Sequence, residues 1–159
     1  MTIQKRNISI EIRKSSKNDE IPYQLLLLAD DTKEAIDKYL HEGELFLAER
    51  DARPVAAFVL KEMNSRIVEI KNIAVSRELQ GNGIGTRMLE YIIDTIRSRG
   101  YAVLNVGTCD QCEKEISFYK KAGFRISSIR KNFFKENYKE PIYENGIQII
   151  DMVVLSLYL

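Results

Sequence analysis

A turn containing three glycines lies in the middle of the chain and limits what the segments around it can form. Residues 80–85 read QGNGIG; an apolar run, residues 67–75, precedes them, and apolar residues recur at the spacing of one helix face after them. Glycine adopts backbone conformations that other residues avoid, and the first amides of a helix have no acceptor within it. A strand, a glycine-rich turn and a helix in this order therefore predict a site for an anion, most naturally phosphate or pyrophosphate.

The spacing of these glycines separates the known kinds of phosphate-binding turn. A dinucleotide fingerprint requires G-x-G-x-x-G, and a P-loop requires Lys and then Ser or Thr after its last Gly. Gly81, Gly83 and Gly85 are two residues apart, and no Lys follows them directly. The turn instead fits Q-x-x-G-x-G, although glycines in so short a motif could also do no more than turn the chain and begin the helix.

Two flanking segments give the turn its context. Residues 68–75 read VEIKNIAV, and residues 116–124 read ISFYKKAGF, which contains the pattern F-Y-x-x-x-G-F. With these elements in this order, the chain resembles the GNAT family of acetyl-CoA-dependent N-acetyltransferases. The Leu-rich segment at residues 25–30 and the Glu-Asn-Gly turn at residues 144–146 make it most similar to small uncharacterised bacterial members.

The periodicity of apolar residues predicts alternating strands and helices. Strands are expected at residues 8–12, 45–48, 54–60, 67–75, 101–106, 124–129 and 147–157, and helices at residues 21–29, 32–41, 84–99 and 113–122. A chain of 159 residues is long enough for one such domain and too short for two ordinary ones, so a single domain over residues 1–159 is expected. The resemblance implies an α/β (α+β) class with the GNAT acyl-CoA N-acyltransferase fold, a mixed, mostly antiparallel sheet flanked by helices on both faces.

The resemblance also implies which residues bind acetyl-CoA. In the family the amides of the glycine turn hold the coenzyme A pyrophosphate, and unpaired amides of the preceding strand contact the pantetheine arm and the thioester oxygen. Cys112 stands where the family often has a pantetheine-contacting Asn, and a thiol is a weak substitute for an amide. The predicted contacts are Ile73, Ala74, Val75, Gln80, Gly81, Asn82, Gly83, Ile84, Gly85, Thr86 and Cys112.

Two side chains are predicted to handle protons in a direct transfer of the acetyl group to a primary amine. By their places in the motifs, Tyr119 resembles the family tyrosine that protonates the leaving thiolate, and Glu69 resembles a glutamate that serves as general base. The base is needed because a primary amine has a pKa of about 10 and is mostly protonated at neutral pH. Glu69 could instead be a surface residue paired with Lys71 or Arg66, and Tyr119 could be only a core aromatic.

Other classes of function compete for the remaining motifs. Cys109 and Cys112 form a C-x-x-C sequence, which is typical of thioredoxin-like redox proteins, but the chain has no Trp and no Pro between Pro54 and Pro141. Two cysteines and the single histidine, His41, are too few for a convincing zinc site, so two reduced thiols and no metal are expected. A non-catalytic sensor or scaffold that binds acetyl-CoA is the alternative to an enzyme.

The acceptor stays open. In the family the segment before the last strand often walls the acceptor site, and residues 131–144 here are rich in aromatic and charged side chains, which suit a cationic amine. The same segment could be no more than a solvated hairpin loop. A small molecule such as a polyamine, an aminoglycoside or an amino acid, and a protein amine, all remain possible.

Charge and hydropathy limit which partners and which cellular location are expected. Lys and Arg total 24 and Asp and Glu total 23, so a strong attraction to nucleic acid or anionic lipid is not expected. Residues 1–7 lack the apolar core of a signal peptide and residues 25–29 are too few to span a membrane, which favours a cytoplasmic protein. The segment 147–159 is too apolar for an exposed edge strand, and a homodimer could cover it.

Overall fold

The computed structural model describes residues 8–159, and the N-terminal expectation for residues 1–7 lies outside them. Within the described residues the strands are β1 (Glu11–Lys14), β2 (Glu44–Arg50), β3 (Arg53–Glu62), β4 (Ile67–Val75), β5 (Val103–Cys109), β6 (Arg125–Arg130), β7 (Tyr143–Glu144), β8 (Ile147–Gln148) and β9 (Met152–Tyr158). The helices are α1 (Tyr23–Leu26), α2 (Lys33–Glu42), α3 (Ile84–Ser98), α4 (Glu113–Lys121) and α5 (Phe133–Asn137), with a 3₁₀ turn η1 (Arg77–Leu79).

Seven of these strands form one sheet in the order β1-β2-β3-β4-β5-β9-β6, and β7 and β8 form a separate hairpin. The pair β4–β5 is parallel, whereas β1–β2, β2–β3, β5–β9 and β6–β9 are antiparallel. The predicted class, a mixed and mostly antiparallel sheet with helices, is confirmed. The described residues divide into two compact units, residues 8–61 with 71–95 and residues 62–70 with 96–159, and β4 contributes to both.

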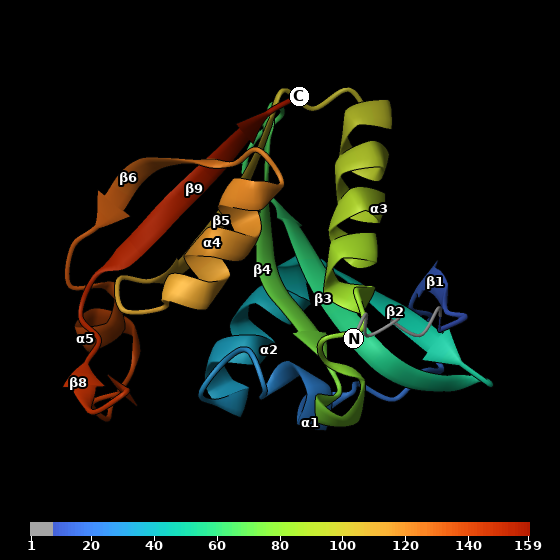
Figure 1. Ribbon diagram of the computed structural model, residues 1–159, viewed down its shortest axis with the longest axis horizontal. Coiled ribbons are helices and arrows are strands. Elements are labelled where there is room, and N and C mark those ends of the chain that lie inside the picture. The colour runs from blue at the N-terminus through green and yellow to red at the C-terminus, as the bar shows by residue number, and fades with distance from the viewer. Residues whose placement is uncertain (1–7) are drawn as a thin grey trace, which may run out of the picture. The chain divides into compact units, whose positions relative to one another are not determined.

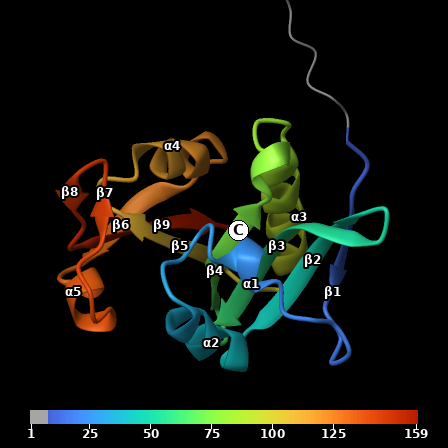
Figure 2. The same ribbon diagram turned by 90° about the horizontal axis from the view of Figure 1, so that it is seen from below.

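In the first unit, helices cover both faces of the β2–β3 hairpin. Side chains alternate along a strand, so Leu45 and Leu47 face a buried cluster with α1 and α2, while Phe46 faces the other way. There Phe46 stacks on Phe58 at 4.8 Å between ring centroids and meets Tyr91 of α3 edge-on at 6.2 Å. Figure 2 shows α2 and α3 on opposite sides of β2 and β3. The hairpin thus forms the middle layer of this unit.

In the second unit, α4 covers one face of the strands β5, β9 and β6, as Figure 1 shows. A methyl group placed on Gly123, just after α4, would lie 3.4 Å from Leu157 of β9. Leu157 and Leu155 therefore face α4, and Ser156 between them faces away. Because Ser156 pairs with Asn105 and Asn105 pairs with Glu69, these polar residues share the face opposite α4.

The last strand differs from its prediction. The expected strand over residues 147–157 is two strands, β8 in the small hairpin and β9 in the large sheet. β9 lies between β5 and β6 and its Val153, Val154 and Leu155 are buried within the chain. Its apolar composition is therefore explained without a second copy, and the homodimer remains only a prediction. The expected loop 131–144 contains α5 and β7.

Element ends also differ where local signals were weak. The first strand begins at Glu11 instead of residue 8, and the first helix is a single turn after Pro22. β5 extends past residue 106 to Cys109 because its last three residues continue to pair with β9. Thr32 is the N-cap of α2, since its Oγ1 accepts a hydrogen bond from the Ala35 amide at 3.1 Å.

Candidate functional site

The glycine turn connects η1 to α3 and has the backbone shape that its sequence predicts. Gly81 and Gly83 both have φ of +82°, in the left-handed region. A methyl group added at either position would meet no atom within 4 Å, so the backbone angle and not lack of space requires glycine there. Gly85 lies within α3 and has no such requirement.

Two polar side chains hold the turn in place. Gln80 donates from Nε2 to the carbonyl of Val75 at 3.0 Å, which ties the turn to the end of β4. Asn82 donates from Nδ2 to the carbonyls of Leu79 and Gln80 at 3.0 and 3.3 Å. These amide groups are used inside the turn, so the side chains of Gln80 and Asn82 shape the loop.

The backbone amides of the turn are available to a ligand. Those of Gly81, Asn82 and Gly83 have no hydrogen-bond acceptor among residues 8–159. The next three, in the first turn of α3, have no acceptor within the helix by its geometry. Successive free amides at the positive end of a helix dipole suit the oxygens of a phosphate or pyrophosphate. The residues present therefore fit the coenzyme A pyrophosphate that the motif predicted.

The end of β4 lies beyond its ladder with β5. That ladder consists of four pairs, from Ile67 with Val103 to Ile70 with Val106. Ile73, Ala74 and Val75 follow the last pair, and Ala74 is buried. Val68, Glu69 and Ile70 are all buried, so burial does not follow a regular two-residue period along this strand.

Tyr119 is buried on α4 among aromatic rings. Its ring centroid lies 5.1 Å from that of Phe118 and 5.6 Å from that of Phe124, and its side chain is 4% exposed. Burial, with a smaller contribution from the negative charge of Glu115, raises the pKa of the Tyr119 phenol above its usual value. The hydroxyl makes no hydrogen bond to any of residues 8–159. Tyr119 is thus a core aromatic whose hydroxyl stays protonated and can donate.

Glu69 is not a surface residue, and it has a partner that sequence reasoning missed. Its side chain is 2% exposed, and Arg130 of β6 donates to it from Nη2 to Oε1 at 2.6 Å and from Nη1 to Oε2 at 3.4 Å. A guanidinium in this forked geometry compensates the charge of a buried carboxylate. The alternative of an exposed glutamate is therefore wrong.

A bulge in β6 decides which way Arg130 points. Arg125 pairs with Ser156 and Arg130 pairs with Met152, and the register shifts between Ile126 and Ser128. Residues five apart on a regular strand face opposite ways, but the extra residue at this bulge puts Arg125 and Arg130 on one face. That face is the one with Ser156 and Glu69.

Polar contacts hold the bulge and a glycine makes room beside Arg130. Ser156 donates to Ser127, the extra residue, at 2.8 Å between hydroxyl oxygens, and Ser127 donates to the carbonyl of Val154 at 3.3 Å. The Arg130 Nη1 lies 3.7 Å from the sulfur of Met152. A methyl group on Gly107 would overlap that sulfur, so Met152 occupies space that only glycine leaves open.

Glu69 and Tyr119 approach the second unit's sheet from opposite faces. Tyr119 belongs to α4, which packs on the face of Leu157, whereas Glu69 pairs with Asn105 and shares the other face with Ser156. The two side chains that were predicted to handle protons therefore lie on opposite faces of this sheet.

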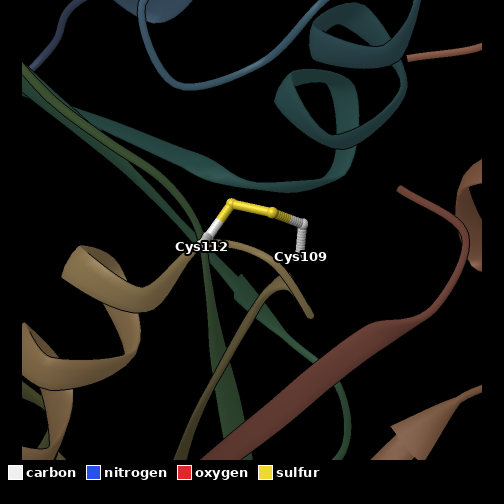
Figure 3. The surroundings of a disulfide bond; sticks show 2 residues. All are labelled: Cys109 and Cys112. Carbon is white, nitrogen blue, oxygen red and sulfur yellow. A yellow bond between two sulfur atoms is a disulfide. The ribbon is translucent and has the colours of Figure 1, made fainter. Parts of the chain in front are cut away.

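The two cysteines are joined, which corrects the expectation of two reduced thiols. Figure 3 shows the disulfide between Cys109, at the end of β5, and Cys112, at the start of α4. The turn brings their Cα atoms to 5.1 Å, and the Cys112 amide donates to the carbonyl of Cys109 at 3.1 Å. Cys112 consequently has no thiol hydrogen to donate to the pantetheine arm, and its predicted contact would have to come from another of its atoms.

The segment 131–144 is partly ordered by its own contacts. Phe133 and Phe134 meet edge-on at 5.2 Å between centroids, and Phe134 stacks on Tyr138 at 5.9 Å. Asp151 accepts the Asn132 amide at 2.9 Å, which, with the nearby Lys131, lowers the pKa of its carboxyl. The aromatic residues therefore form a small cluster, and its role toward an acceptor remains a prediction.

Three remaining features of residues 8–159 concern membranes, metals and a surface hollow. None of the helices in the described part of the chain is long and apolar enough to cross a membrane. Among residues 8–159, no three His, Cys, Asp or Glu side chains are grouped so that they could hold a metal ion. A surface hollow next to the β2–β3 turn is lined by Ile8, Ser9, Glu11 and residues 49–52, none of which is a predicted site residue.

Comparison with known proteins identifies the family. Residues 11–124 match the model of the acetyltransferase (GNAT) family. The N-acetyltransferase YvbK of Bacillus subtilis, itself uncharacterised, is 40% identical over 157 residues, covering 99% of both chains. A GNAT acetyltransferase from Elizabethkingia anophelis, solved with acetyl-CoA bound, is 45% identical with a TM-score of 0.91, covering 94% of this chain and 98% of that one. A Bacillus subtilis acetyltransferase solved with CoA is 37% identical with a TM-score of 0.86, covering 95% and 99%. The chain belongs to the GNAT family and is an N-acetyltransferase that uses acetyl-CoA.

Proposed function

We propose that this enzyme transfers the acetyl group directly from acetyl-CoA to a primary amine, with the glycine turn, Tyr119 and Glu69 in separate roles. The amides of the turn hold the pyrophosphate. Tyr119 donates a proton to the departing thiolate, and Glu69 accepts one from the ammonium, directly or through water. Amides of Ile73 to Val75 polarise the thioester carbonyl, a role worth roughly 10²-fold to 10³-fold in rate at other oxyanion sites.

The proposed binding of the coenzyme A pyrophosphate is supported mainly by the run of free backbone amides in the turn. Gly81 and Gly83 hold left-handed backbone angles, and the amides of residues 81–83 have no acceptor among residues 8–159. Buried polar groups are normally paired, and a run of amides open to a ligand at a helix start is the arrangement that binds phosphate. The end of the β4–β5 ladder at Ile70 supports free strand amides beyond it.

The proposed proton transfers are supported by the positions of Glu69 and Tyr119, which lie on opposite faces of one sheet. Tyr119 has no competing hydrogen-bond partner among residues 8–159 and a raised pKa, so it retains its proton at neutral pH. The side chain of Glu69 is buried and paired with Arg130. The protonated phenol of Tyr119 is the form that a proton donor needs.

The test is coenzyme A release from acetyl-CoA with four primary amines: spermidine, kanamycin, L-lysine and a peptide with N-terminal Ala. We expect thiol release with at least one of them, and a loss of roughly 10²-fold in kcat for Tyr119→Phe and for Glu69→Gln at unchanged acetyl-CoA affinity. Calorimetric binding of acetyl-CoA without thiol release for any amine would instead favour a sensor.

The remaining expectations belong to the same proposal. We place the enzyme in the cytoplasm, acting without a metal and without nucleic acid or membrane as partner. The acceptor is a small molecule or a protein amine. The homodimer stays a prediction that the burial of β9 does not support, and a monomeric mass by light scattering at micromolar concentration would contradict it.

A further inference from the structure

We propose that Arg130 is a positioning residue that holds Glu69 in its working orientation, and that the bulge at Ser127 serves to aim it. This inference rests on the proposed role of Glu69 as general base. Arg130 would act through Glu69 and would not contact the acceptor amine. Its distance from Glu69 along the chain, 61 residues, makes the contact a product of the fold alone.

The geometry of the pair supports this role. Glu69 is 2% exposed, and both of its carboxylate oxygens face the two terminal nitrogens of Arg130. A forked guanidinium fixes the plane of a carboxylate in a way that a single ammonium cannot. General base catalysis depends on that plane, because a carboxylate must present a lone pair within hydrogen-bond reach of the proton that it accepts.

The surroundings of Arg130 also fix its direction. The side chain is 34% exposed and runs from the last residue of β6, an edge strand. Its guanidinium lies next to Met152 Sδ, and Met152 in turn occupies the space over Gly107. The Ser127 hydroxyl contacts Ser156 and the carbonyl of Val154, which stabilises the bulge. If β6 kept the pairing of Arg125 with Ser156 but had no bulge, Ile129 would pair with Met152. Arg130 would then face the opposite side of the sheet from Glu69.

The experiment is a double-mutant cycle on kcat with the four amines named above as probes. We expect kcat to fall roughly 10²-fold for Glu69→Gln and by a similar factor for Arg130→Met, with the acceptor KM within about threefold. The double variant Glu69→Gln/Arg130→Met should be no slower than Glu69→Gln alone, because a residue that acts through another has no effect once its partner is gone. Arg130→Lys should recover part of the loss by restoring the charge without the fork.

Arg125→Met is the matched control, since Arg125 lies on the same strand and the same face but pairs with Ser156. We expect its kcat to equal that of the wild type. Thermal unfolding and acetyl-CoA titration of each variant separate loss of folding from loss of catalysis. Arg130→Met that is less stable but fully active would overturn the proposal, leaving a merely structural ion pair.

Each other outcome points to one conclusion. Additive losses in the double variant would overturn the positioning role and indicate that Arg130 contacts the acceptor itself. Full activity of Glu69→Gln would overturn the proposed base and the positioning role with it. Loss in Glu69→Gln together with full activity of Arg130→Met would overturn this inference alone and leave the proposed function intact. Absence of turnover with every amine would overturn the proposed function and leave no catalysis for Arg130 to support.

Discussion

The glycine turn and the Glu69–Arg130 pair are constructed in different ways. The turn is made of main chain: six consecutive residues supply its glycines, its free amides and the side chains that hold it. The pair is made of side chains from β4 and β6, brought together across two intervening strands. A backbone site depends on local φ angles, whereas a side-chain site depends on register over the whole sheet. Substitutions in the turn should therefore change coenzyme affinity, and substitutions on the sheet should change the rate of the chemical step.

The largest expected effect comes from a side chain, that of Tyr119 on α4, and not from the backbone of the turn. Tyr119→Phe keeps the ring that packs against Phe118 and Phe124 and removes only the hydroxyl. We expect kcat to fall by roughly 10²-fold, because a positioned proton donor contributes on this order, while acetyl-CoA affinity is unchanged. Steady-state kinetics and calorimetry measure the two quantities. Tyr158→Phe, at a side chain that is 78% exposed, is the control and should match the wild type.

On the turn side, Gly83→Val should weaken acetyl-CoA binding by about 10-fold to 100-fold at nearly unchanged kcat. A β-branched residue at a φ of +82° is strained by about 1–3 kcal/mol, and relief of that strain would turn the free amides away from the phosphates. Gly100→Val carries the same strain, at φ of +86°, but lies after α3 and should lower stability without changing affinity. Equal losses of affinity in both variants would show that the turn has no special role.

The disulfide tests the same comparison further. It joins residues that are close in the chain, yet it lies in the second unit, which contains the Glu69–Arg130 pair. Replacing Cys109 and Cys112 together by Ser removes a cross-link between residues three apart. The chain-entropy estimate for so short a loop is about 2 kcal/mol of unfolding free energy. Urea unfolding should show this loss in the double variant and, to a similar extent, in the wild type with a reducing agent. A large fall in acetyl-CoA affinity would instead mean that the closed turn shapes the pantetheine contact.

The smallest effect concerns the protonation of Tyr119. Its folded pKa lies above the unfolded value of about 10, so the folded state keeps a proton that the unfolded state loses as pH rises past 10. Stability is therefore complete below pH 10 and falls above it, by about 1 kcal/mol from this group between pH 10 and 11. Urea unfolding at both pH values should show a smaller fall for Tyr119→Phe. An equal fall would assign the effect to Tyr39, whose pKa is also raised by burial.

The sequence allowed prediction of the features that depend on neighbouring residues. β4 was predicted with its correct ends and α3 and α4 within a residue, and the expected glycine turn precedes α3, with two of its three glycines, Gly81 and Gly83, in the left-handed region. The motifs also indicated the family, which the comparisons confirm. These predictions succeeded because periodicity and turn chemistry are local properties.

Features that depend on contacts between distant residues were not predicted. Arg130 was not recognised as the partner of Glu69, because the bulge at Ser127 reverses which residues of β6 face Glu69 and no local signal marks it. The apolar β9 suggested an interface between copies, although the sheet order places it inside one chain. The disulfide was missed because cysteine spacing alone does not decide between thiols and a bond.

Gly107 has no side chain, yet it affects the surroundings of the Glu69–Arg130 pair. Any larger residue there would displace Met152, and Met152 lies against the guanidinium of Arg130. In a library of random single substitutions selected for acetylation, clones altered at position 107 should be rare, even those carrying alanine. Because Gly107 contacts neither reactant, intolerance to mutation there would show how far from the reacting groups the residues required for catalysis extend.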